Sequence, residues 1–137
     1  MGIRRRKGVA IVDTEKGILV GAIGDTFLLP GGGAKHWESR KKAAIRELYE
    51  ETKLKTNSIK YLFSDIGIKW HNHEGKLIQN HSKIFLVKFE GIPKPSHEIK
   101  KIAFYKPGSK LKLGEGSKKI IDIYLAKYKK PLPDYQP

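Results

Sequence analysis

Residues 30–54 read PGGGAKHWESRKKAAIRELYEETKL, a proline and three glycines followed by a long run of helix-forming residues. From Glu38 to Leu54 the segment contains neither glycine nor proline, the two strongest helix breakers. This composition predicts a helix over Glu38–Leu54. The glycines in front of it predict a loop that interrupts regular structure.

Three glutamates share one face of the predicted helix. Glu47, Glu50 and Glu51 are spaced i, i+3 and i+4, so their side chains are neighbours. Like charges at this spacing repel by about 0.2–0.5 kcal/mol per exposed pair. A different stripe of the same helix can bury against a sheet: Ala44, Ile45, Leu48 and Thr52. The helix is therefore expected to be buried on one side and to present carboxylates on another.

Clustered carboxylates have two interpretations. They can form a solvated acidic helix face, or they can bind hard divalent cations such as Mg²⁺, which prefers oxygen ligands and tolerates water among them. The glycine loop favours the second interpretation, because glycines let a ligand approach the main chain and a helix N-terminus attracts anions. A pair of such cations can clamp an in-line phosphoryl displacement.

Strand-like segments flank the helix on both sides. Three precede it, at Gly8–Val12, Gly17–Ile23 and Thr26–Leu29. Three follow it, at Asn57–Lys69, Leu77–Phe89 and Ile99–Tyr105, before a last helix that Ser117 would cap and Pro131 would end. A single mixed sheet with a helix on each face would bury the apolar stripes of both helices, so the predicted fold class is α/β.

Length and composition limit the classes of protein. The 137 residues fit one domain over residues 1–130 with a C-terminal tail at 131–137. No apolar run approaches the roughly 20 residues of a membrane-spanning helix, so no membrane association is expected. Cysteine is absent, which excludes disulfides, thiolate metal sites and a catalytic cysteine, and is consistent with a reducing cytoplasm.

The net charge is strongly positive, with 28 basic and 14 acidic residues and a formal charge of +14. This surplus favours an anionic partner such as phosphates or nucleic acid, although dispersed lysines also serve solubility. The basic segment Arg4–Lys7 has the same two interpretations. It is either a solvated tail or a grip on distal phosphates or an RNA backbone, with Arg5 as the candidate contact.

The spacing of the glycine loop and the acidic helix resembles the signature of the Nudix hydrolases, G-x5-E-x7-R-E-U-x-E-E-x-G-U, where U is a bulky aliphatic residue. Here it reads Gly32-x5-Glu38-x7-Arg46-Glu47-Leu48-Tyr49-Glu50-Glu51-Thr52-Lys53-Leu54. The resemblance implies a Nudix-type α/β/α sandwich. The one departure is Lys53 in place of glycine. Lys53 would either adopt a left-handed conformation, at a cost of about 1 kcal/mol, or let the helix continue towards Asn57.

The resemblance also implies roles for individual residues. Glu50 and Glu51 would be the principal Mg²⁺ or Mn²⁺ ligands, and Glu47 would bind metal or act as the base. Glu38 would hold the loop or support the metal, and Arg46 would hold carboxylates by charge-assisted hydrogen bonds. Further expected contributors are a main-chain carbonyl of Gly31 for the metal, and Gly32 and Gly33 for the substrate.

Family members often add a carboxylate from a distant loop. Glu98, just before the Ile99–Tyr105 segment, is the candidate, with Glu74 and Glu90 as alternatives.

The expected activity is hydrolysis of a P–O–P anhydride in a nucleoside diphosphate-linked substrate. The small size resembles MutT-like enzymes that act on nucleoside triphosphates or oxidised nucleotides. Alternatives are hydrolysis of dinucleoside polyphosphates or diphosphoinositol polyphosphates, hydrolysis of RNA 5′ ends, and binding of nucleotide or RNA without turnover. A homodimer is a further expectation.

Overall fold

The computed structural model of the chain describes residues 2–129. The strands are β1 (Ile3–Ile11), β2 (Asp13–Thr14), β3 (Gly17–Ile23), β4 (Thr26–Leu28), β5 (Gly31–Gly33), β6 (Lys55–His71), β7 (Leu77–Glu90) and β8 (Lys101–Tyr105). The helices are α1 (Arg40–Thr52) and α2 (Glu115–Ile123), and α2 continues into the π-helical turn η1 (Tyr124–Tyr128).

The strands form two four-stranded sheets. The first has the order β5-β1-β7-β6 and is mixed, because β1 and β7 are parallel while the other pairs are antiparallel. In the second sheet β3 pairs with β2, β4 and β8. The sequence predicts one mixed sheet, whereas the structure has two. Both edges of β1 are already occupied by β5 and β7, so β3 pairs elsewhere.

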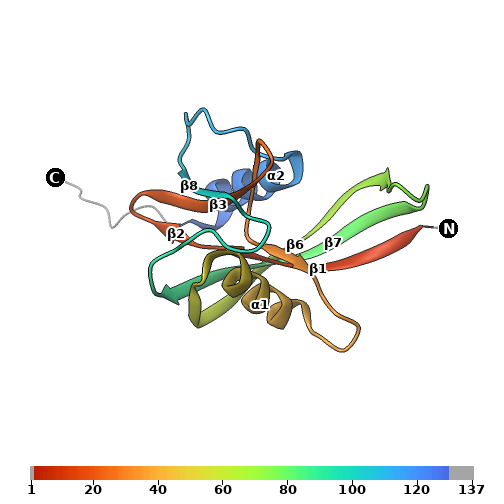
Figure 1. Cartoon of the computed structure of the whole chain (residues 1–137), viewed down its shortest axis with the longest axis horizontal. Coiled ribbons are helices and arrows are strands. Elements are labelled where there is room, and N and C mark those ends of the chain that lie inside the picture. Colours follow the sequence, from red (N-terminus) through yellow and green to blue (C-terminus); the bar gives the residue numbers. More distant parts are fainter. Residues whose placement is uncertain (1, 130–137) are drawn as a thin grey trace.

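The two helices lie on opposite sides of β1 (Figure 1). Alternate residues of a strand point to opposite faces. Ala10 therefore belongs to the core cluster of α1, whereas Val9 and Ile11 belong to the cluster of α2. The first cluster includes Ala44, Leu48 and Phe85, and the second includes Ile84, Ile120 and Ile121. The predicted α/β sandwich with a helix on each face is thus confirmed.

Helix α1 is bounded by clear caps. The hydroxyl of Ser39 accepts a hydrogen bond from the Lys42 amide at 3.0 Å, as an N-cap does. The helix ends at Thr52, and Lys53 adopts the left-handed conformation with φ 64°. Of the two alternatives for Lys53, the structure therefore shows the strained one.

Two segments differ from the sequence-based expectation. The glycines do not interrupt regular structure, because they form β5, which pairs antiparallel with β1. Gly31 has φ 149°, and a Cβ there would lie 2.4 Å from the carbonyl oxygen of Gly8, so only glycine fits this close pairing. The basic segment Arg4–Lys7 is not a solvated tail, since it is part of β1 and pairs with β7 from Ile3 onwards.

The last helix also begins earlier than expected. Gly114 is the N-cap of α2, and Ser117 lies inside the helix, where its hydroxyl accepts a hydrogen bond from the Leu29 amide at 2.9 Å. Ser117 thus connects α2 to the chain segment before the glycines. The predicted tail at 131–137 lies outside the described residues.

Candidate active site

One guanidinium group connects the glycine segment with the acidic face of α1. Arg46 donates through Nε and Nη2 to the two carboxylate oxygens of Glu38, at 2.8 and 2.9 Å. Its Nη1 donates to Glu47 Oε1 at 2.9 Å and to Glu50 Oε2 at 3.2 Å, and its Nη2 also donates to the Gly33 carbonyl at 3.2 Å. Arg46 therefore fixes Glu47 and Glu50 side by side.

The paired charges stabilise each other. The hydrogen bonds from Arg46, with a smaller contribution from the Lys35 amide, lower the pKa of Glu38 from 4.5 to about 2. The hydrogen bond to Glu38 is also the largest cause of the raised pKa of Arg46. Glu38 is therefore ionised throughout the neutral range.

Glu51 has the opposite electrostatic character. It is partly buried, and its Oε1 accepts a hydrogen bond from the Gly31 amide at 3.2 Å. Burial, together with the neighbouring Glu47 carboxylate, raises the pKa of Glu51 from 4.5 to about 8, although the Gly31 amide and Lys7 act in the lowering direction. Glu51 thus lacks enough positive charge nearby to hold a full negative charge at neutral pH.

The glycines place the main chain directly against these carboxylates. A Cβ on Gly32 would lie 2.6 Å from the Glu47 carboxylate carbon, a separation that side chains do not tolerate. Gly33 is less constrained, since its Cβ would lie 3.4 Å from Nε of Arg5. The absence of a side chain at Gly32 therefore lets Glu47 lie against β5.

Glu51 lines a cavity of about 260 Å³ between the first sheet and the start of α2. Gly31 and Lys7 line it as well. Lys7 is partly buried, and its pKa is lowered by desolvation and by Arg5, against the opposing effect of Glu51 and Glu47. Other lining residues are apolar, namely Val9, Ile23, Leu28, Leu29, Ile99 and Ile120, or polar, namely Asp65, Asn80, Ser82, Glu115 and Ser117.

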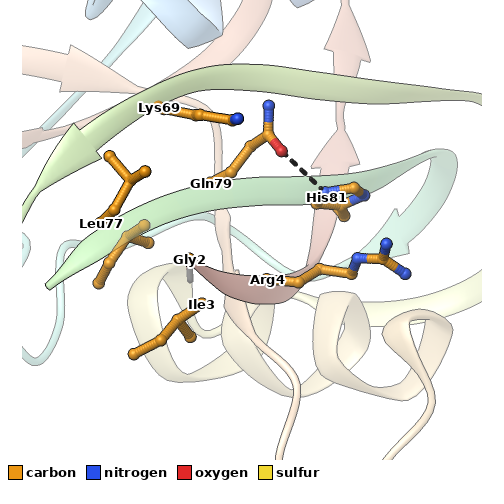
Figure 2. Close-up of a pocket in the computed structure, with 8 residues that line it drawn as sticks. Gly2, Ile3, Arg4, Lys69, Leu77, Gln79 and His81 are labelled. Carbon is orange, nitrogen blue, oxygen red and sulfur yellow. Dashed lines mark hydrogen bonds between the residues drawn. The ribbon is translucent and has the colours of Figure 1, made fainter.

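A second hollow lies at the outer end of the first sheet, where Arg4 and Lys69 flank Gln79 and His81 (Figure 2). His81 Nε2 and Gln79 Oε1 are 3.3 Å apart. No carboxylate is among the described residues that line it. Of these two cavities, only the one at Glu51 has carboxylates in its described lining. Of the helices in residues 2–129, none is both long enough and apolar enough to cross a membrane.

Comparison with known proteins identifies this arrangement. The model of the NUDIX domain matches residues 3–122, which include the glycine segment, α1 and every residue of the cavity lining. The chain belongs to the Nudix family. A crystal structure from Chromobacterium violaceum, of a protein assigned to the Nudix hydrolase family, is 32% identical over 96% of this chain and 84% of its own, with a TM-score of 0.77.

More distant Nudix structures share the fold. The MutT protein from Methanosarcina mazei Go1 is 18% identical, with a TM-score of 0.74 over 94% of this chain and 98% of its own. A bifunctional NMN adenylyltransferase/ADP ribose pyrophosphatase from Francisella tularensis, complexed with AMP and Mn ion, is 21% identical, with a TM-score of 0.65 over 92% of this chain and 42% of its own. A search of curated proteins found no match. This Nudix chain is an enzyme, a pyrophosphohydrolase.

Nudix hydrolases generally use a divalent metal ion, and the donor set of this chain fits one. Within residues 2–129 no three acidic or histidine side chains are already gathered as a metal-binding group. Glu47 nevertheless shares Arg46 with Glu50 and raises the pKa of Glu51, so the three carboxylates are neighbours. A divalent cation would supply the charge that Glu51 lacks, and Mg²⁺ retains water as part of its coordination.

The structure places the other predicted site residues as follows. Gly31 contacts Glu51 through its amide, whereas the prediction concerned its carbonyl. Glu98 is exposed and does not line the cavity, although the next residue, Ile99, does. The alternatives Glu74 and Glu90 are exposed as well.

Sequence reasoning missed three polar residues that line the cavity, namely Asp65, Asn80 and Ser82, and it considered Lys7 only as part of the basic segment Arg4–Lys7. Lys7 lies two residues before the buried Val9, so the period-2 pattern of a strand gives a signal for it. The other three depend on pairing between distant strands, which leaves no local signal.

Proposed function

We propose that this Nudix chain hydrolyses a P–O–P anhydride of a nucleoside diphosphate-linked substrate, with Mg²⁺ or Mn²⁺ held by Glu47, Glu50 and Glu51. One observation carries the proposal. Glu51, crowded by Glu47 and held by the Gly31 amide, lines the same cavity as the partly buried Lys7. Negative groups that bind a cation thus lie beside a positive group that binds phosphate.

The chemistry is displacement at phosphorus. A divalent ion held by Glu47, Glu50 and Glu51 would neutralise the anhydride oxygens and make a water molecule more acidic. The water oxygen forms a bond to one phosphorus while the bond from that phosphorus to the bridging oxygen breaks, and the departing phosphate keeps the electron pair. A carboxylate of α1 accepts the proton of the water, with Glu47 as one candidate.

The remaining residues position these groups. Arg46 holds Glu47, Glu50 and Glu38 and contacts the glycine segment, so it acts on the geometry of the site. Lys7, which lines the cavity, would contact phosphate oxygens, and Arg5, which lies beside Gly33, is a second candidate for such a contact.

The size of the cavity favours a MutT-like mononucleotide substrate. Its volume of about 260 Å³ is below the roughly 300–1,000 Å³ of pockets that enclose drug-sized ligands, so it suits a single nucleotide better than a dinucleotide. The charge of +14 keeps dinucleoside polyphosphates, diphosphoinositol polyphosphates and RNA 5′ ends as alternatives. A homodimer, a cytoplasmic location and a single domain over residues 1–130 stay predictions.

The test is a substrate panel assayed with Mg²⁺ and Mn²⁺. It contains nucleoside triphosphates, oxidised dGTP, ADP-ribose, dinucleoside polyphosphates, diphosphoinositol polyphosphates and capped RNA, and hydrolysis in ¹⁸O water locates the attacked phosphorus. Glu51→Gln should lower turnover by at least about 10²-fold, whereas Glu74→Gln, an exposed residue in the turn between β6 and β7, should not. Equal metal-dependent rates in the two variants would refute the proposal. If the chain binds a compound of the panel but hydrolyses none of them, the alternative of a nucleotide- or RNA-binding module is favoured instead.

A further inference from the structure

A row of polar residues crosses three strands of the first sheet beneath α2. Lys7 of β1 is paired with Ser82 of β7, and Ser82 is paired with Asp65 of β6. All three residues line the cavity of Glu51. Of the three buried polar residues in the described part of the chain, Asp65 and Ser82 are two, 9% and 5% exposed. Buried polar groups therefore concentrate on one wall of this cavity.

A second row lies next to the first. Asn80 of β7 is paired with Arg5 of β1, and an irregularity in β6 between Ile66 and Lys69 leaves Gly67 beside Asn80. The Oδ1 atom of Asn80 is buried and has no hydrogen-bond partner in the structure. Buried polar atoms nearly always have a partner, so a donor from a ligand is the natural explanation for this oxygen. Asn80 and Gly67 both line the cavity.

The strand order separates Asp65 from the end of the cavity at which Lys7 and Glu51 lie. Asp65 lies two strands away from Lys7 in the order β1-β7-β6 (Figure 1). Adjacent strands are roughly 4.7–4.9 Å apart, so the two positions are separated by about 10 Å. The cavity therefore has a phosphate end at Glu51 and Lys7 and an acceptor end at Asp65 and Asn80.

The side walls of the cavity include apolar surface. Ile23, Leu28, Leu29 and Ile99 supply apolar surface to the cavity, and the acceptor groups lie at one side of it. The cavity therefore combines apolar surface with polar groups, and such polar groups can orient a small ligand.

Asp65 is fixed in place from the helix side. Its Oδ1 lies 2.8 Å from Nζ of Lys119, which is on α2. This ion pair orients the carboxylate and leaves Oδ2 for another donor. Asp65 and Asn80 both line the cavity, and each has a side-chain oxygen that can accept a further hydrogen bond.

We propose that Asp65 and Asn80 select the nucleobase of the substrate, and that the favoured base presents adjacent N–H donors, as guanine does with its ring N1–H and exocyclic amine. This inference rests on the proposed function in one respect, that the substrate is a nucleotide. Adenine and cytosine have a ring nitrogen acceptor beside their amine, and uracil has carbonyl oxygens on both sides of its N–H. Each of these bases would therefore bring one of its own acceptors against an acceptor oxygen of Asp65 or Asn80, which is unfavourable.

The experiment measures binding apart from turnover. Dissociation constants for GMP, AMP, CMP and UMP are determined by calorimetry without divalent metal, for the wild-type chain and its variants. The wild type should bind GMP at least about tenfold more tightly than the other three, as expected for paired hydrogen bonds to one base edge. Asp65→Asn, which replaces an acceptor by a donor, and Asn80→Leu, which removes the acceptor, should each reduce this preference to about threefold or less.

Two further variants test the structural alternative, in which Asp65 only fastens α2 to β6. Lys119→Met removes the ion pair but keeps the carboxylate, so it should reduce the preference for GMP less than Asp65→Asn does. Lys118→Met, which breaks an exposed ion pair with Asp122 on the same helix, is the matched control. Preference retained in both Asp65→Asn and Asn80→Leu, or equal wild-type affinity for all four nucleotides, would overturn the inference. If Asp65→Asn does not fold, the result for Asn80→Leu decides.

Failure of the inference differs from failure of the proposed function. A chain that prefers GMP yet hydrolyses no anhydride keeps the inference and loses the function. A chain that hydrolyses nucleoside triphosphates of all four bases with equal kcat/KM, and binds their monophosphates equally, keeps the function and loses the inference.

Discussion

Arg46 and Glu38 form a two-point ion pair, with Nε and Nη2 of the guanidinium donating to the two carboxylate oxygens at 2.8 and 2.9 Å. The pair joins α1 to the segment before it, and the remaining nitrogen of Arg46 holds Glu47 and Glu50. The positions of two candidate metal ligands thus depend on a residue that is not expected to touch the metal.

Arg46→Lys should therefore lower metal-dependent kcat/KM by about 10–100-fold, because lysine keeps the charge but cannot donate in a fixed fork to several carboxylates. The apparent affinity for Mg²⁺ should fall as well, and both are measured by steady-state assays over a range of Mg²⁺ concentrations. Arg40→Lys is the control on the same helix, since Arg40 donates one long hydrogen bond, to the His81 carbonyl at 3.3 Å. Full activity in Arg46→Lys would show that the several hydrogen bonds from the guanidinium group are not needed for activity.

The Arg46–Glu38 ion pair also predicts how the free energy of unfolding depends on pH. The pKa of Glu38 is about 2 in the folded chain and about 4.5 in its ordinary state. The stabilisation is therefore complete above pH 4.5 and is lost as the pH falls through 2, because the unfolded chain takes up the proton first. Urea denaturation between pH 5 and pH 2.5 should show a smaller decrease in unfolding free energy for Glu38→Gln than for the wild type. An identical decrease in the wild type and in Glu38→Gln would contradict the lowered pKa of Glu38.

Glu51 predicts a pH dependence of the opposite sign in metal-free protein. Its folded pKa of about 8 lies above its ordinary 4.5, so its contribution to stability is present below pH 4.5 and is lost as the pH rises through 8. With EDTA present, Glu51→Gln should be more stable than the wild type at pH 8.5 and closer to it at pH 5. Adding Mg²⁺ at pH 8.5 should raise the melting temperature of the wild type more than that of the variant. Glu90→Gln, exposed at the end of β7, should behave as the wild type.

Lys53→Gly should stabilise the chain by up to about 1 kcal/mol, because Lys53 has φ 64° and glycine adopts this conformation without a Cβ clash. Part of the gain is offset by the greater freedom of glycine in the unfolded chain. Chemical denaturation measures the change. The control Lys41→Gly, at an exposed position inside α1, should instead destabilise by about 1 kcal/mol. A destabilised Lys53→Gly variant would show that the left-handed conformation carries little strain.

Gly32→Ala should reduce activity without unfolding the chain. The new Cβ would meet the Glu47 carboxylate carbon at 2.6 Å, and this side chain can move at the expense of its position in the site. A shift of about 1 Å can cost about 10²-fold in rate. Gly8→Ala is the contrasting variant, because its Cβ would meet the Arg40 carbonyl oxygen of the α1 backbone at 1.9 Å, and we expect it to destabilise the fold itself. Wild-type rates in Gly32→Ala would show that the reaction does not depend on the position of the Glu47 carboxylate.

The sequence by itself determined the features that depend on local spacing. The helix with its three neighbouring glutamates follows from the 3.6-residue period, which places i, i+3 and i+4 together wherever the helix lies. Gly32, Glu38 and Arg46 belong to the same motif, and its resemblance to the Nudix signature predicted the family. That Arg46 pairs with Glu38, and that Gly32 lies against Glu47, is seen only in the structure.

Only the tertiary structure decided where the long-range partners of that motif lie. The pairing of Lys7 with Ser82 and of Ser82 with Asp65 joins residues far apart in the chain. A shift of one residue in either register would turn these side chains to the other face of the sheet. For the same reason, only the structure shows that Arg4–Lys7 is part of a strand, because its parallel partner β7 lies far away in the sequence. The polar wall of the cavity likewise combines residues from three strands, so it cannot be predicted from any single segment.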